Sequence, residues 1–176
     1  FIRRGISLNE QLEDAYRALG EAIPAKGKDA TDKQISAATA YMKDNFFDVR
    51  LFGAVMSTGN APADKVTGPV TVGIGRSIDP VLPMELGITR TASTKVEDRD
   101  NASQMGSKTV VPYGLYSVRI HYQPTRDNRV TEDDLGLLWN SITMMFEVTR
   151  SAARPDVNVR RLDVFSHASP LGNAPA

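Results

Sequence analysis

The chain has 176 residues and a mass of 19.2 kDa, and 41% of the residues are hydrophobic, which suits one domain with a single core better than two. Cysteine is absent, which excludes disulfides and thiolate metal sites, and no apolar run approaches the roughly 20 residues of a membrane span. Lysine plus arginine (21) balance aspartate plus glutamate (21), so any nucleic-acid site must be local. With no signal-peptide pattern either, we expect a soluble cytoplasmic protein with no membrane partner.

Two amphipathic helices are predicted at the beginning of the chain. Ser7 and Glu10 form a capping-box pattern ahead of a helical repeat that ends at Gly20. Thr31 and Gln34 repeat this pattern ahead of the second helix. The two apolar stripes are Leu8, Leu12, Tyr16 and Leu19, and then Ile35, Ala38, Met42 and Phe46.

Two strands are predicted next, over residues 48–56 and 70–78, because apolar residues there recur at every second position. In the second strand Gly73 and Gly75 occupy the opposite parity, where a bulge or a close approach of another backbone fits. This strand is expected to be irregular.

Residues 88–112 have no clear period and are rich in Thr, Ser, Asn and mixed charges, which predicts a long functional or disordered loop. A strand with one buried face is predicted over residues 116–122, with Tyr116 in the core. Thr131 begins a helix with Asp133 and Asp134 in its first turn. The apolar stripe of this helix is Leu135, Leu138, Trp139, Ile142 and Phe146.

A last strand is predicted over residues 157–165, and a flexible tail over residues 169–176. The resulting order predicts one α+β domain over residues 1–168. It resembles a ferredoxin-like βαββαβ domain that lacks its first strand and carries an insertion between its central strands. We therefore expect Phe1 to be a boundary behind which that strand lies.

Several separated motifs, in order, resemble one known family. They are residues 48–59 (DVRLFGAVMSTG), 68–80 (GPVTVGIGRSIDP), 88–92 (ITRTA), 108–116 (KTVVPYGLY), 144–153 (MMFEVTRSAA) and 164–167 (VFSH). Over about Asp48 to His167 the chain is similar to the backbone protein of CRISPR type I-C Cascade complexes, a member of the RAMP superfamily.

This resemblance implies a non-catalytic subunit that polymerises along a guide RNA (crRNA) in antiviral defence. It implies a ferredoxin-like, RRM-like palm and a thumb over residues 88–112 that displaces bases periodically. The implied partners are crRNA, target DNA, other copies of the chain and the other Cascade subunits. No cofactor is implied.

Candidate RNA-binding residues follow from the need for cations and hydrogen-bond donors along phosphates. Arg50, Arg76 and Ser77 fit this role best, although pairing of both arginines with carboxylates such as Asp48 and Asp79 is an equal alternative from charge pattern alone. In the thumb, the expected RNA contacts are Arg90, Lys95, Arg99 and Lys108, with Met105 as a wedge between bases. The alternative for these residues is an ordinary solvated loop.

Four further arginines, Arg150, Arg154, Arg160 and Arg161, form the most basic local stretch. They are second-rank candidates for contact with nucleic acid or a neighbouring subunit, and a solvated helix end is an equal alternative. Three aromatic residues, Tyr113, Tyr116 and Phe52, are candidates for stacking on bases, although the core is favoured for Tyr116.

Catalytic and metal chemistry find little support. His121 and His167 are the two histidines, and neither has a carboxylate at metal-ligand spacing. The Gly73-Ile74-Gly75 segment matches neither a Walker loop nor a dinucleotide loop. Two rival functions remain: a metal-dependent subunit that cuts target RNA through Asp98 or Asp100, and a structural subunit that serves assembly alone.

Overall fold

The structure is a computed structural model that describes residues 5–25, 29–90, 104–126, 129–152, 154–170, 172 and 173, without the side chain of Gln104. The chain forms two compact units. The first comprises Phe1–Val72, Ile120–Arg150 and Asp156–Ala176, and the second comprises Gly73–Arg119 and Ser151–Pro155. The expectation of a single domain over residues 1–168 stays a prediction.

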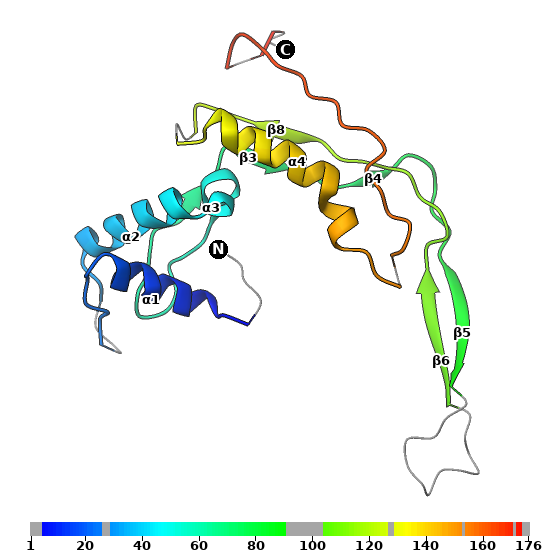
Figure 1. Cartoon of the computed structure of the whole chain (residues 1–176), viewed down its shortest axis with the longest axis horizontal. Helices are drawn as coiled ribbons and strands as arrows, with labels where there is room; N and C mark the ends of the chain where they lie inside the picture. Colours follow the sequence, from blue (N-terminus) through cyan, green and yellow to red (C-terminus); the bar gives the residue numbers. More distant parts are fainter. Residues whose placement is uncertain are drawn as a thin grey trace, which may run out of the picture. The chain divides into compact units, whose positions relative to one another are not determined.

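Three helices of the first unit begin where the sequence predicts (Figure 1). They are α1 (Leu8–Ala18), α2 (Asp32–Asn45) and α4 (Glu132–Val148). Each begins with a complete capping box, in which the N-cap hydroxyl accepts from a backbone N–H and the side chain three residues on accepts from the N-cap N–H. These three predictions are confirmed.

The strand predicted over residues 48–56 is wrong for most of its length. Residues Phe47–Phe52 form a short helix, α3, and only Gly53–Ala54 form a strand, β1. Val49 is buried in one core cluster and Leu51 in another, so apolar residues lie on opposite sides of one helical turn. A helix buried on two sides has no amphipathic period, and its alternating pattern is typical of a strand.

Two antiparallel strand pairs complete the first unit. β1 pairs with β2 (Val66–Thr67), and β3 (Val70–Val72) pairs with β8 (Ile120–Tyr122). One core cluster lies among α1, α2 and α3, and a second joins Leu51, Val70 and Leu138 beneath α4. The buried residues of the first cluster are Leu12, Ala15, Tyr16, Ala38, Met42, Val49, Met56, Ala61, Ala63 and Val66.

The second unit contains two further antiparallel pairs. β4 (Arg76–Ser77) pairs with β7 (Tyr116–Ser117), and β5 (Met84–Arg90) pairs with β6 (Gln104–Val110) in a seven-residue register. The expectation of an irregular loop over residues 88–112 is therefore wrong for the strand residues at its two ends. The polar residues of β6 hide the period because this two-stranded ribbon has no buried core face to select apolar side chains.

The last predicted strand is also wrong, because none of the described residues 154–170 belongs to a strand. Alternation of apolar and polar residues produces a strand only where a neighbouring strand satisfies its backbone N–H and C=O groups. β3 and β8 form a sheet of two strands, which residues 157–165 do not join. Helices and small antiparallel sheets together confirm the α+β class. The ferredoxin-like, RRM-like palm, its thumb and the tail over residues 169–176 stay predictions.

Candidate nucleic-acid interface

Arg50, in the last turn of α3, donates hydrogen bonds from all three guanidinium nitrogens. Nε and Nη2 donate to the two carboxylate oxygens of Asp134, at 2.9 and 2.6 Å. Nη1 donates to the backbone carbonyls of Lys43 and Asp44, at 2.9 and 3.1 Å. The guanidinium therefore joins the end of α2 to the start of α4 within the first unit, and an RNA-binding role for Arg50 stays a prediction.

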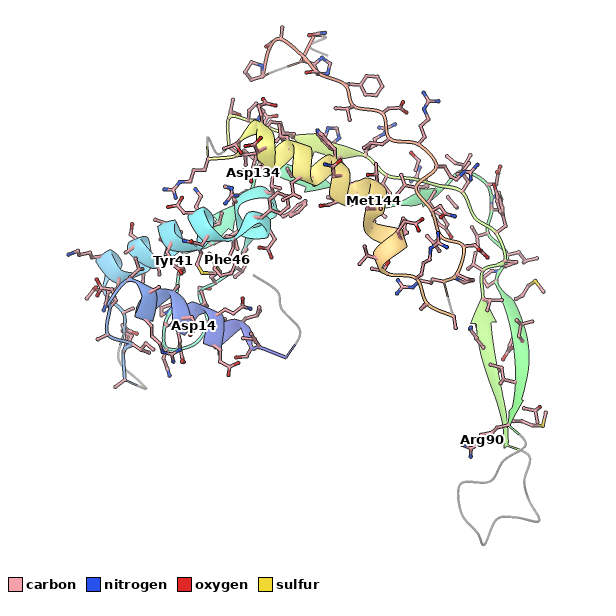
Figure 2. All side chains as sticks on the ribbon, viewed as in Figure 1. Asp14, Tyr41, Phe46, Arg90, Asp134 and Met144 are labelled. Atoms are coloured by element: carbon pink, nitrogen blue, oxygen red, sulfur yellow. The ribbon has the colours of Figure 1, made fainter. Side chains whose placement is uncertain are left out.

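Asp134 also belongs to the capping box of α4, and Figure 2 shows it near the beginning of that helix. Its carboxylate accepts from the backbone N–H of Thr131 at 3.0 Å as well as from Arg50. These bonds, chiefly those from Arg50, lower the pKa of Asp134 to about 2, although burial opposes the shift. Arg50 therefore pairs with a carboxylate, as the alternative from its charge pattern has it, and Asp134, far away in the sequence, is a partner.

Arg50 and a second arginine, Arg129, line one pocket, which has a volume of about 250 Å³. Arg129 donates to the carboxylate of Asp44 at 2.6 Å. Asp44, Arg50, Arg129, Thr131 and Asp134 line the pocket. Because each arginine faces a carboxylate, the pocket offers little net attraction to a phosphate.

Arg76 and Ser77 form β4 in the second unit, directly after the two glycines. Arg76 is exposed and Ser77 is half-buried. Val72 pairs with Ile120 and Arg76 with Ser117, so three residues, 73–75, oppose two, 118 and 119. This extra residue is a β-bulge, and it confirms the irregular strand predicted from Gly73 and Gly75.

Two of the three bulge residues, Gly73 and Gly75, lack a side chain, and Ile74 between them is 95% exposed. Gly73 donates its N–H to the carbonyl of Arg119 at 2.8 Å, and an added Cβ at Gly73 would lie 3.1 Å from that oxygen. Arg119, which is exposed, is a further cation beside the bulge that was not predicted as a site residue. Arg119 alternates with Val118 and Ile120 along the predicted strand, which places its side chain on the polar face. This alternation could have identified Arg119 as a candidate.

The hairpin of β5 and β6 carries the thumb candidates that the structure describes. Arg90 and Met105 are exposed, and Lys108 is half-buried. Arg90 pairs across the ladder with Gln104, Lys108 with Leu86 and Met105 with Thr89, so the two cations share one face and Met105 lies on the other. Lys95 and Arg99 lie outside the described residues, as do Asp98 and Asp100.

The four second-rank arginines are exposed. Arg150 donates to Glu147 at 2.8 Å, and Arg161 donates to Asp163 at 2.9 Å. Arg154 belongs to the second unit, whereas Arg150, Arg160 and Arg161 belong to the first. Their contacts with nucleic acid or with a neighbouring subunit stay predictions.

Exposed aromatic rings are present at all three predicted positions. Tyr113 is 74% exposed, Tyr116 is 52% exposed and Phe52 is 43% exposed, so the core position favoured for Tyr116 is wrong. The Tyr116 ring lies against Gly114, where an added Cβ would come within 2.7 Å of it. A ring in this position keeps a face that a base could stack on.

No three of the histidine, aspartate and glutamate side chains in the described part of the chain gather closely enough to hold a metal ion. Within that same part, none of the helices has both the length and the apolar character to cross a membrane. The chemistry that the described surface offers is therefore that of scattered cations, hydroxyls and exposed rings.

Comparison with known proteins gives one family. The model of the family described as "CRISPR-associated protein Cas7" matches residues 1–176, the whole of the chain. Among curated proteins no match is found.

Proposed function

The chain belongs to the Cas7 family and is a backbone subunit of a CRISPR effector, and we propose that it binds guide RNA without catalysing a reaction. We further propose that it belongs to a type I-C Cascade complex. Copies of the chain would line up along crRNA beside the other Cascade subunits, while base pairing by the guide selects the target DNA. In such a complex the copies of the chain hold the shape of the RNA.

One observation supports the RNA contact most directly. The bulge at residues 73–75 precedes Arg76 and Ser77 with two glycines, so a phosphate can approach the backbone without meeting a side chain at those positions. Arg76 supplies the charge and Ser77 supplies a hydroxyl donor. Arg90 and Lys108, on one face of the hairpin, are the proposed thumb contacts, with Lys95, Arg99 and Met105.

The decisive experiment measures the affinity of the full-length protein for fluorescent single-stranded RNAs of unrelated sequence across a range of salt. In Arg76→Ala we expect similar weakening for every RNA, and a slope of log affinity against log salt that is shallower by about 0.7, the value for one phosphate contact on a single strand. Arg17→Ala is the matched control, because this exposed arginine on α1 already pairs with Glu13 and Asp14 at 3.0 and 2.6 Å. Sequence-selective loss, or no loss, would contradict the proposal.

A second experiment, on the assembled complex, tests the absence of catalysis. Complementary RNA is added with magnesium, and we expect this RNA to remain intact. Cleavage that disappears in Asp98→Ala or Asp100→Ala would establish the rival reading of a target-cutting subunit. An absorbance spectrum without nucleic acid in the purified complex would instead favour a subunit that serves assembly alone.

A further inference from the structure

The ladder of β4 and β7 extends beyond the two residue pairs of these strands. Backbone hydrogen bonds of 2.8 Å continue it on both sides. On one side the N–H of Ile78 donates to the carbonyl of Leu115, and on the other the N–H of Gly73 donates to the carbonyl of Arg119. The strand from Leu115 to Arg119 is therefore held along its length within the second unit.

Three polar side chains share one face of this ribbon. Arg76 lies directly opposite Ser117, and opposed residues of an antiparallel pair point to the same side. Arg119 is two positions from Ser117 along the same strand, so its side chain points to that side as well. All three residues are exposed. We call Arg76, Ser117 and Arg119 the arginine face.

The two arginines of this face carry positive charge that no carboxylate offsets. Within the described part of the chain, neither Arg76 nor Arg119 forms an ion pair. Other arginines of the chain do pair with carboxylates, namely Arg17, Arg50, Arg129, Arg150 and Arg161. Diagonal neighbours in a ladder are about 7 to 8 Å apart, so the arginine face concentrates two charges that attract anions.

Ser117 is the neighbour of both arginines. It lies about 5 Å from Arg76 across the ladder and about 7 Å from Arg119 along the strand. Its side chain is shorter than theirs, which leaves room above it for a ligand that the two guanidinium groups hold. Its hydroxyl can both donate and accept a hydrogen bond, and the 2′-hydroxyl of a ribose has the same capacity.

We propose that Ser117 recognises the ribose 2′-hydroxyl of an RNA strand whose phosphates Arg76 and Arg119 bind, and that it thereby distinguishes RNA from DNA. One sugar joins two consecutive phosphates, so a strand held by both arginines places that sugar over Ser117. The inference rests on the proposed function for the RNA contact at Arg76. It adds Arg119 as a second phosphate contact and Ser117 as a residue that determines specificity.

The test of Ser117 compares the affinity of the full-length protein for fluorescent single-stranded RNA and DNA of the same sequence. In Ser117→Ala we expect RNA binding to weaken by about 2- to 10-fold, the effect of one neutral hydrogen bond, and DNA binding to stay unchanged. Ser117→Thr retains the hydroxyl and should retain the preference for RNA. Ser141→Ala is the matched control, because Ser141 is an exposed serine on α4.

Arg119→Ala tests the second phosphate contact with the same two oligonucleotides. We expect RNA and DNA binding to weaken by the same factor, since both strands carry the phosphate. The slope of log affinity against log salt should become shallower by about 0.7 for each strand. Arg76→Ala should behave in the same way, and the preference for RNA should survive in both variants.

Equal weakening of RNA and DNA binding in Ser117→Ala, or no change in RNA affinity, would overturn the role of Ser117. An unchanged salt slope in Arg119→Ala would overturn the second phosphate contact. Either result, combined with RNA binding that still depends on Arg76, would leave the proposed function standing. A wild type without affinity for RNA would contradict both the inference and the proposed function.

Discussion

The contact between Arg50 and Asp134 shows how one residue can carry several tasks. Asp134 accepts from the N-cap of its own helix and from both Nε and Nη2 of Arg50. It is only 7% exposed, so its charge depends on these donors. Removing either partner would leave a charge poorly compensated in the core of the first unit.

The free energy of unfolding of the first unit should therefore fall in acid, and protonation of Asp134 should account for most of this fall. Its folded pKa of about 2 lies below the ordinary value of 3.8, so its contribution is fully present above pH 4 to 5 and disappears as the pH falls towards 2. A difference of this size corresponds to about 2 kcal/mol. Urea unfolding of the wild type and of Asp134→Asn, from pH 6 down to pH 2, measures it.

In Asp134→Asn we expect a flatter dependence on pH and a loss of about 3 kcal/mol at neutral pH, because Arg50 then lacks its carboxylate. Asp133→Asn is the control, since Asp133 lies in the same helical turn and is exposed. The control should lose stability in acid as the wild type does. If Asp134→Asn also had the same dependence of stability on pH as the wild type, the proposed role of Asp134 would be wrong.

At this scale the sequence could predict residue types and could not predict partners. Arg50 and Asp134 are 84 positions apart, and Asp48 was the nearer carboxylate. Nothing in a local charge pattern distinguishes the two. By contrast, each capping box depends on residues three positions apart, which is why those at Ser7 and Thr31 could be predicted, and the start of α4 at Thr131 could be predicted from the acidic residues of its first turn.

At the scale of elements, the transition from α3 to β1 depends on Gly53. Its φ of +79° is in the left-handed region, where side chains are strained. An added Cβ would also meet the carbonyl oxygen of Val66 and would lie 2.6 Å from the N atom of Gly68. The short pair of β1 and β2 leaves little freedom to relieve such a clash.

Gly53→Ala should thus destabilise the protein by more than the roughly 1 to 3 kcal/mol of backbone strain alone, because its ψ of 172° combined with positive φ is a conformation that is essentially restricted to glycine. Gly136→Ala is the matched control, since an added Cβ there has no neighbour within 4 Å and the site lies inside α4. We expect that control to gain about 0.5 to 1 kcal/mol from helix propensity. Thermal unfolding of both variants measures the two effects, and a tolerated Gly53→Ala would contradict the proposed clash.

The elements that could be predicted are those with one buried face. α1, α2 and α4 each bury a single stripe, and period and caps together locate them. α3 is buried on two sides and β6 on neither, so each lacks the period of its own class. The bulge could be anticipated because glycine itself marks the position.

At the scale of the whole molecule, the formal net charge is zero. Contact between copies of the chain and binding of RNA should therefore depend on different forces. A neutral chain has no overall repulsion to oppose contact between copies, and apolar side chains such as Leu86, Ile88 and Met144 are exposed. RNA binding by contrast requires local cations and releases counterions. The two processes should respond to salt in opposite directions.

We expect RNA affinity to fall steeply when salt rises from about 50 to 200 mM, because each phosphate contact releases counterions. Self-association in the absence of RNA should hold or strengthen over the same rise in sodium sulfate, since sulfate favours the burial of apolar surface. Sedimentation velocity measures the second quantity and fluorescence anisotropy the first. Met144→Glu should lose the sulfate-resistant association while a single copy still binds RNA, because the carboxylate interrupts the exposed apolar side chains of α4, such as Leu137 and Val148, and leaves the bulge beside Arg76 unchanged. Parallel loss of both activities with salt in the wild type would show that ion pairs or bridging RNA, and not apolar faces, hold the copies together.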